Sequence, residues 1–180
     1  MVHRSRYQFA ISPPERIKKD IMYFKEEFKN RFGYFESYFT TPSITVAYAN
    51  LPEEKEQSFF EDLKNTISRI PGFELYFHDF DYFRNSRTIF IDVSDQKNFT
   101  TIVKSMRNVS STYGLEKEFT SSSYPHMTIA KKLHISKFNK AQIEYFTRQY
   151  DEHFDVNQLE VLKLDQTSMK YDHYQTLELC

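Results

Sequence analysis

Apolar and polar positions along this chain change period several times, and each change predicts a different element. In the segment "RYQFAI", the apolar residues Tyr7, Phe9 and Ile11 alternate with polar ones, which is typical of a half-buried strand. After two prolines, apolar residues recur at three- and four-residue steps from residue 15 to about residue 32. This spacing predicts an amphipathic helix that ends at Gly33.

The same reasoning divides the rest of the chain into strands and helices. Strands are expected over 43–49, 73–83, 87–94, 125–133, 158–166 and 174–180, and helices over 52–70, 96–113 and 139–150. The predicted order is β-α-β-α-β-β-α-β-α-β-β, and no long linker interrupts it. We therefore expect residues 1–180 to form a single domain, built of two lobes.

Two of the predicted strands share one pattern of residues, Pro-x-Φ-Thr-Φ-Ala, where Φ is apolar. "PSITVA" at residues 42–47 and "PHMTIA" at residues 125–130 superpose without a gap. Side chains alternate along a strand, so His126 and Thr128 share one face, as do Ser43 and Thr45, while the apolar residues between them point to a core. The repeat predicts an internal duplication about a pseudo-two-fold axis, with both polar faces lining one cleft.

Composition narrows the possible partners. The formal net charge of −1 gives no broad attraction for duplex DNA. Three glycines and the absence of a Gly-rich phosphate loop mean that any phosphate must be held by side chains. Cys180 is the only cysteine, so no disulfide or cysteine metal site can form within one chain. No secretory signal or membrane-spanning stretch is evident, which favours a cytoplasmic protein with no membrane partner and no evident obligate protein partner.

The paired strands resemble the 2H phosphoesterase superfamily, in particular its 2'-5' RNA ligase-like (LigT-like) branch. That family is defined by two His-Φ-[Ser/Thr]-Φ motifs, where Φ is apolar, and the resemblance extends from "YQFAISPPE" to the C-terminal hairpin. It implies an α/β (α+β) bilobal fold in which two antiparallel sheets line a central cleft and helices lie outside. "PHMTIA" fits the motif fully. "PSITVA" departs from it because Ser43 replaces the histidine, so the first motif, Ser43-Ile44-Thr45, is degenerate.

The resemblance also implies a chemistry. Members of the family open 2',3'-cyclic phosphates or hydrolyse 2'-5' phosphodiesters of RNA or nucleotides, without a metal or cofactor. The partner of this chain would be a nucleotide or RNA end that carries a cyclic or 2' phosphate. By resemblance, the catalytic residues are His126, Thr128 and Thr45, and the substrate-binding residues are Ser43, Lys131 and Arg87.

Ser43 leaves open whether the protein is an active enzyme. A serine hydroxyl neither accepts nor releases a proton readily near neutral pH, so it cannot replace a histidine in acid-base catalysis. One hypothesis is a phosphodiesterase with impaired catalysis, and the alternative is a non-catalytic module that binds a nucleotide or RNA end. A purely structural descendant with a filled cleft is a third interpretation, which the retained His126, Thr45, Thr128 and Lys131 argue against.

Other candidate residues have plainer explanations. His78 could substitute for the missing histidine, but it alternates with Tyr76 and Phe80 and is expected on a partly apolar face. The aromatic residues of segment 76–83 could stack on bases, although such runs in strands are usually core. Lys131 and Lys132 should point to opposite sides of their strand, so at most one faces the cleft. The remaining histidines are expected on the surface: His3, His134, His153 and His173.

Overall fold

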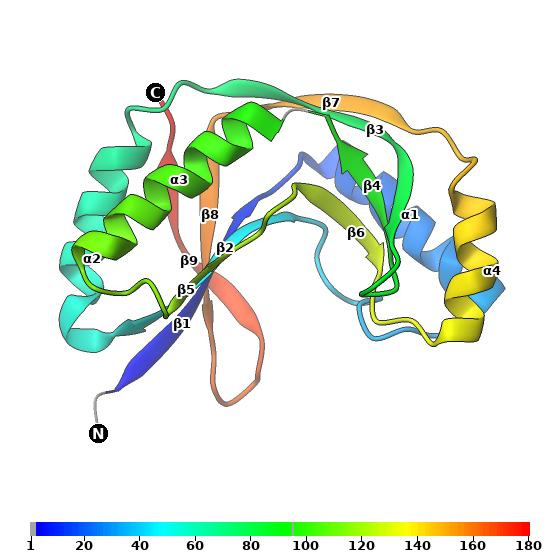
Figure 1. Cartoon of the computed structure of the whole chain (residues 1–180), viewed down its shortest axis with the longest axis horizontal. Coiled ribbons are helices and arrows are strands. Elements are labelled where there is room, and N and C mark those ends of the chain that lie inside the picture. The colour runs from blue at the N-terminus through cyan, green and yellow to red at the C-terminus, as the bar shows by residue number, and fades with distance from the viewer. Residues whose placement is uncertain (1–2, 95) are drawn as a thin grey trace.

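A computed structural model describes residues 3–94 and 96–180, and within them the chain forms nine strands and four helices (Figure 1). The elements are, in order, β1 (Arg4–Ile11), α1 (Glu15–Phe32), β2 (Ile44–Pro52), α2 (Glu53–Ile67), β3 (Phe73–Phe83), β4 (Thr88–Val93), α3 (Gln96–Thr112), β5 (Phe119–Ser121), β6 (His126–Ala130), α4 (Ile135–Tyr145), β7 (Asp151–Val156), β8 (Gln158–Leu164) and β9 (Tyr171–Glu178).

The strands form two antiparallel sheets. The five-stranded sheet has the order β5-β2-β1-β8-β9, and the four-stranded sheet has the order β6-β4-β3-β7. Helices α2 and α3 pack on the first sheet and α1 and α4 on the second, so all four lie on the outer sides and the uncovered faces turn toward the middle of the molecule (Figure 1). The strands that carry the two motifs, β2 and β6, contact each other. The predicted bilobal α/β fold with helices outside is confirmed.

Two strands and the position of one helix were not predicted correctly. Strand β5 is too short to show a period, and β7, "DEHFDV", has only Phe154 and Val156 as apolar residues. It forms because it pairs with β3 as an edge strand. The helix predicted at 139–150 starts earlier and ends at Tyr145, because the His134 ring accepts a hydrogen bond from the Ser136 N–H (3.4 Å) and caps its first turn.

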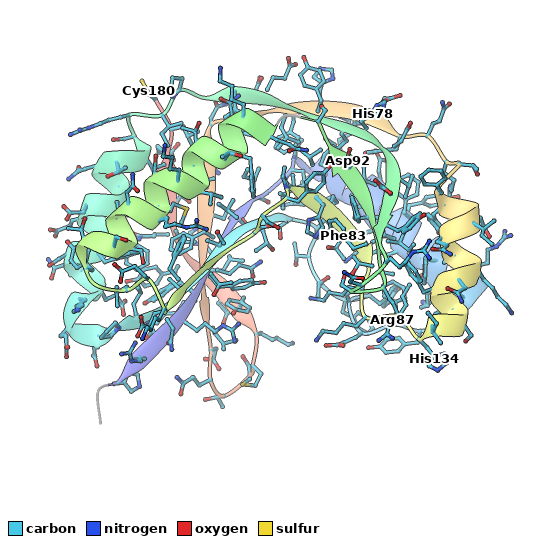
Figure 2. All side chains as sticks on the ribbon, viewed as in Figure 1. His78, Phe83, Arg87, Asp92, His134 and Cys180 are labelled. Atoms are coloured by element: carbon cyan, nitrogen blue, oxygen red, sulfur yellow. The ribbon has the colours of Figure 1, made fainter. Side chains whose placement is uncertain are left out.

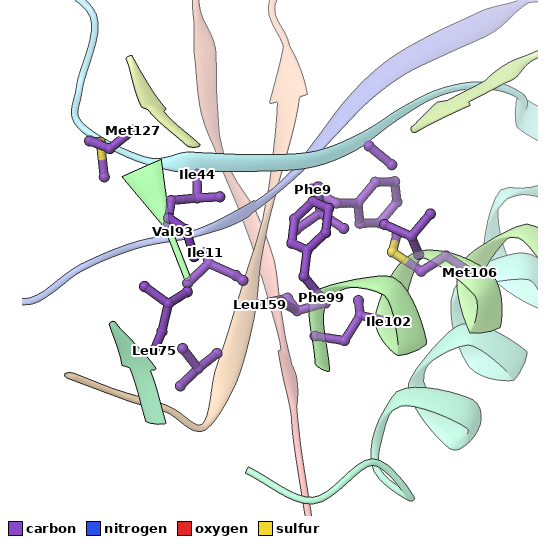
Figure 3. Close-up of a cluster of buried hydrophobic side chains, with 14 of the residues drawn as sticks. Phe9, Ile11, Ile44, Leu75, Val93, Phe99, Ile102, Met106, Met127 and Leu159 are labelled. Carbon is purple, nitrogen blue, oxygen red and sulfur yellow. The ribbon is translucent and has the colours of Figure 1, made fainter. Parts of the chain in front are cut away.

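Both sheets share one continuous apolar core (Figure 3). The alternating apolar residues of the motif strands, Ile44 and Val46 in β2 and Met127 and Ile129 in β6, are all fully buried in it. This burial confirms the predicted core faces of both strands. Among the described residues, no helix is long and apolar enough to cross a membrane.

The loop between α1 and β2 is fixed by a buried lysine. The ammonium of Lys25 in α1 donates hydrogen bonds to the carbonyl oxygens of Ser37 (3.0 Å) and Thr40 (2.7 Å) and to Thr40 Oγ1 (2.9 Å). Lys25 is 1% exposed and has no carboxylate partner within the described part of the chain. Burial, together with the nearby charge of Lys131, lowers the pKa of Lys25 to about 8. The ammonium thus joins the middle of α1 to the segment that leads into β2.

We expect the substitution Lys25→Met to destabilise the protein, because it leaves buried carbonyl oxygens without a donor. Each buried polar group without a partner costs about 1–3 kcal/mol, and the loss should appear as a lower midpoint of urea unfolding. The exposed Lys19 on the same helix provides the control, since Lys19→Met should change stability by less than about 0.5 kcal/mol. A loss at Lys25 no larger than the loss at Lys19 would contradict this anchoring role.

Candidate functional site

His126 is held in one tautomer at the start of β6. Its Nδ1 lies 2.8 Å from the carbonyl oxygen of Tyr124. A carbonyl oxygen can only accept a hydrogen bond, so Nδ1 carries the proton in the neutral ring and Nε2 keeps its lone pair. Within the described part of the chain, Nε2 has no hydrogen-bond partner. The half-buried ring therefore presents a proton acceptor.

The surroundings of His126 keep the ring neutral. Burial lowers the pKa of His126, and the charge of Lys131 lowers it further, while the bond to the Tyr124 carbonyl and the charge of Asp92 raise it by less. The net effect is a pKa below the usual value, so the neutral form dominates at neutral pH. A neutral imidazole with a free Nε2 is suited to act as a general base.

Asp92 and Tyr124 support this histidine and were not predicted from the sequence. Asp92 lies directly opposite His126 on β4, and its Oδ1 accepts a hydrogen bond from the Tyr124 hydroxyl (2.6 Å). Burial and this bond to Asp92 raise the pKa of Tyr124 to about 12, so its hydroxyl stays protonated. One sequence signal was present, because Asp92 is the only charged residue in "TIFIDV", which is apolar apart from Thr88.

Two aromatic rings form a wall beside His126. Phe83 and Phe90 stack on each other with ring centroids 4.1 Å apart, and their centroids lie 4.9 and 5.3 Å from the imidazole. In Figure 2, Phe83 and Asp92 lie toward the middle of the molecule. The aromatic run of β3 is thus divided, since Phe77 and Phe80 are buried in the core whereas Phe83 lies at the site.

On the facing strand, Thr45 is ordered by Gln8 of β1. The Gln8 Nε2 donates a hydrogen bond to Thr45 Oγ1 (3.0 Å), which leaves the hydroxyl proton of Thr45 free to be donated elsewhere. Ser43 directly precedes β2 and is half-buried, and no hydrogen bond of its side chain occurs among the described residues. Gln8 alternates with the buried Tyr7 and Phe9, so the same period that predicted β1 could have identified it.

A β-bulge in β2 adds Tyr48 to the same face. Thr45 and Ala47 pair with consecutive residues of β1, which leaves Val46 as an extra residue. Val46 and Ala47 both point to the core, and the next residue, Tyr48, returns to the face of Thr45. Period-two reasoning alone would have placed Tyr48 on the opposite face.

Strand β6 has a bulge at the matching position. Thr128 and Ala130 pair with consecutive residues of β4, so Ile129 is the extra residue and both Ile129 and Ala130 are buried. Lys131 therefore follows on the face of Thr128. Lys132 is exposed and forms an ion pair with Glu36 (3.8 Å), in agreement with the prediction that at most one of the two lysines faces the site.

Arg87 lies at the rim, away from His126. It is exposed at the tip of the β3–β4 hairpin with a positive φ of 50°, and its carbonyl oxygen accepts a hydrogen bond from the Leu133 N–H (3.2 Å). Figure 2 shows Arg87 at the end of the hairpin opposite to Asp92. The structure thus brings Arg87 near the segment that follows β6, and leaves Thr45, His126 and Thr128 on the motif strands β2 and β6, of which β6 is the edge of its sheet.

His78 is not close enough to replace the missing histidine. It pairs with Asp92, which pairs with His126, so it is two strands away, roughly 9–10 Å across the sheet. The predicted alternation with Phe80 was wrong, because a bulge at Asp79 sends Phe80 into the core and leaves His78 exposed.

One group of side chains within the described residues has the composition of a metal site. The possible ligand atoms of His78, Asp79 and Asp151 lie within 4.8 Å of one another. His78 Nδ1 is 3.2 Å from Asp151 Oδ1, so an ion pair also accounts for the cluster.

A hollow of about 490 Å³ lies on the helix side of the five-stranded sheet, lined by Glu56, Lys163 and Tyr174 among others. Lys163 and Glu56 form an ion pair in its wall (3.4 Å), and the motif residues do not line it.

Comparisons with known proteins identify a family and a shared fold. A family model described as the 2'-5' RNA ligase superfamily matches residues 13–168. The structure of E. coli LigT with NADP+ superposes with a TM-score of 0.73 at 16% identity, covering 98% of this chain and 99% of that chain. TT0787 of Thermus thermophilus gives a TM-score of 0.70 at 14% identity, covering 96% and 97%. At these identities the structural matches establish a shared fold. No curated protein matches the sequence.

We expect Asp92→Asn to lower the pKa of His126 further, because it removes a negative charge that stabilises the protonated ring. The asparagine oxygen can still accept the Tyr124 hydroxyl, so the fold should be kept. NMR titration of the imidazole measures the effect directly. Asp151→Asn is the matched control, since this exposed carboxylate lies in the same row of the sheet but three strands from His126, and it should leave the pKa unchanged. Equal shifts in both variants would contradict the specific influence of Asp92.

Proposed function

Because the chain belongs to the 2'-5' RNA ligase superfamily, as a LigT-like 2H phosphoesterase fold, we propose that it binds or acts on 2',3'-cyclic or 2'-5' phosphodiesters of RNA or nucleotides. The observation that carries this proposal is the state of His126, a neutral imidazole with an unpartnered Nε2 on the strand that contacts β2. A cytoplasmic location, expected from the sequence, stays a prediction.

In the proposed reaction, the motif residues take separate roles. Water attacks the phosphorus of a 2',3'-cyclic phosphate, a P–O bond forms, and the bond from phosphorus to the 3'-oxygen breaks, which leaves a 2'-phosphate. The water gives up one proton and the leaving 3'-oxygen receives one, and His126 serves one of these transfers. Thr45 and Thr128 donate hydrogen bonds to the non-bridging oxygens, and Lys131 balances the negative charge of the transition state.

Nucleotide binding is the part of the proposal with the broadest support. Structures of E. coli LigT contain phosphate, 3'-AMP, ATP or NADP+. In this chain, Thr45 has a free hydroxyl proton, and Lys131 forms no ion pair among the described residues. These groups are suited to a phosphate at the end of a nucleotide or RNA strand.

The second proton transfer lacks a histidine, which favours impaired catalysis. Ser43 occupies the motif position and can only form hydrogen bonds there. Loss of one acid-base group costs roughly a hundred- to ten-thousand-fold in rate. For the same reason, a non-catalytic module that binds a nucleotide or RNA end is the second candidate function.

Binding of a nucleoside 2'-phosphate should weaken when the phosphate ligands are removed. Thr128→Val keeps the shape of the side chain but removes the hydroxyl, and His126→Ala removes the imidazole, which donates to the phosphate once Nε2 takes up a proton. A lost hydrogen bond to a charged group corresponds to roughly a ten- to hundred-fold lower affinity by calorimetry. Thr101→Val, at an exposed threonine of α3, should have no effect. Unchanged affinity in both site variants would place the ligand elsewhere.

A histidine at position 43 should raise activity if its absence is the only defect in the catalytic residues. We expect Ser43→His to increase 2',3'-cyclic phosphodiesterase activity by at most about a hundred- to a few-thousand-fold, measured by turnover of the cyclic nucleotide. The gain is smaller if neighbours such as Tyr48 leave little room for the imidazole. The pH profile should be bell-shaped, since one histidine must be neutral while the other is protonated.

Adding His126→Ala to this variant should abolish the gain. A folded Ser43→His protein that binds the nucleotide yet shows no turnover above background would rule out the phosphodiesterase function and leave the binding module.

A further inference from the structure

The loop between α1 and β2, residues 33–43, presents three clustered aromatic rings. Tyr34 is 61% exposed and Phe39 is 78% exposed, and the half-buried Tyr38 lies beside both. The ring centroids of Tyr38 and Phe39 are 4.7 Å apart, and that of Tyr34 lies 6.5 and 6.3 Å from them. We call Tyr34, Tyr38 and Phe39 the aromatic cluster. Tyr38 packs against the core, and its hydroxyl contacts Lys29 and Glu26. Tyr34 and Phe39 instead expose most of their rings, which is typical of a binding surface.

The backbone beneath the aromatic cluster is fixed at several points. Lys25 binds the carbonyl oxygens of Ser37 and Thr40 from below. The ammonium of Lys137 in α4 donates to the carbonyl oxygen of Tyr34 (2.7 Å), and the Lys131 N–H donates to Ser37 Oγ (3.2 Å). The rings are thus exposed on a preorganised loop, so that contact with a ligand would cost little ordering entropy.

The aromatic cluster lies close to the motif residues along the chain and carries unpaired positive charge. Ser43 follows Phe39 by four positions, a span of at most about 14 Å. Of the lysines around the loop, Lys29 and Lys132 pair with glutamates. Lys131 and Lys137 pair with no carboxylate among the described residues. Exposed rings next to cations without a carboxylate partner are the composition of surfaces that bind single-stranded nucleic acid, where bases stack on rings and cations follow the backbone.

We propose that the aromatic cluster stacks the bases of a single-stranded RNA whose phosphate-bearing end lies at His126, so that the ligand of this protein is an oligonucleotide end in preference to a free mononucleotide. This inference rests on the proposed function of the same site. Stacking on rings tolerates any base, so the aromatic cluster gives affinity for a strand and little sequence preference.

The experiment compares two ligands by fluorescence anisotropy competition at one fixed salt concentration. One is adenosine 2'-phosphate, and the other is a single-stranded RNA of about six nucleotides that ends in the same 2'-phosphate. The RNA should bind more tightly than the mononucleotide. Phe39→Ala and Tyr34→Ala should each weaken RNA binding by about five- to a hundred-fold and leave mononucleotide binding unchanged, as expected for the loss of one stacked base.

Two further variants separate stacking from other effects. Phe39→Trp should retain RNA affinity, whereas Phe39→Leu, which stays apolar without a π-face, should lose it nearly as far as alanine does. Tyr23→Ala is the matched control, because Tyr23 is 64% exposed on α1 outside the loop and should have no effect.

Each outcome decides between the proposals. Equal affinity for the two ligands, or retained RNA affinity in Phe39→Leu, would overturn the stacking role while mononucleotide binding still supports the proposed function. Parallel loss of both ligands in Phe39→Ala would also overturn it, since the loop would then act through the phosphate site. Binding of neither ligand to the unaltered protein would defeat the proposed function itself.

Discussion

The site depends on one constraint, the continuous apolar core beneath both motif strands. Ile44 and Val46 of β2 and Met127 and Ile129 of β6 are fully buried in that core, from opposite sheets (Figure 3). Residues that alternate with them cannot point the same way, so the polar residues of each strand must lie on the uncovered faces. Because β2 and β6 also contact each other, two segments far apart in sequence present their hydroxyl and imidazole groups to a common region. Packing of apolar side chains thus positions the polar chemistry.

The two motif strands resemble each other in a β-bulge as well as in sequence. Each motif strand has a bulge directly after its threonine, at Val46 and at Ile129. The bulge puts two consecutive residues into the core and returns the next one to the uncovered face, which is Tyr48 in one lobe and Lys131 in the other. One lobe therefore contributes an aromatic ring and the other a cation from matching positions. This difference, together with Ser43 against His126, makes a nearly symmetric fold chemically asymmetric.

In this protein the residues that stabilise the fold differ from those that would transfer protons. Ser43 precedes β2 and is only half-buried, so the core does not depend on whether serine or histidine stands at this position. His126 in contrast is held by Tyr124 and Asp92, which set its tautomer and influence its pKa. The chain has kept the supported histidine, whose Nε2 can accept a proton, and the ordered Thr45, whose hydroxyl can donate to a phosphate. Loss of the other histidine affects the step that needs a second proton carrier.

The sequence by itself determined the features that are set by local period and by the repeated motif. The helix at 15–32, the strand at 73–83 and the core faces of the two motif strands follow from side chains a few residues apart. Strand β7 could not be predicted, because its polar sequence is extended only through pairing with β3. The bulge that places Lys131, the pairing of Asp92 with His126 and the bond from Gln8 to Thr45 all join residues that are distant in sequence. Only tertiary structure decides such features, since a register shift or a hydrogen bond depends on both partners and the local pattern describes one.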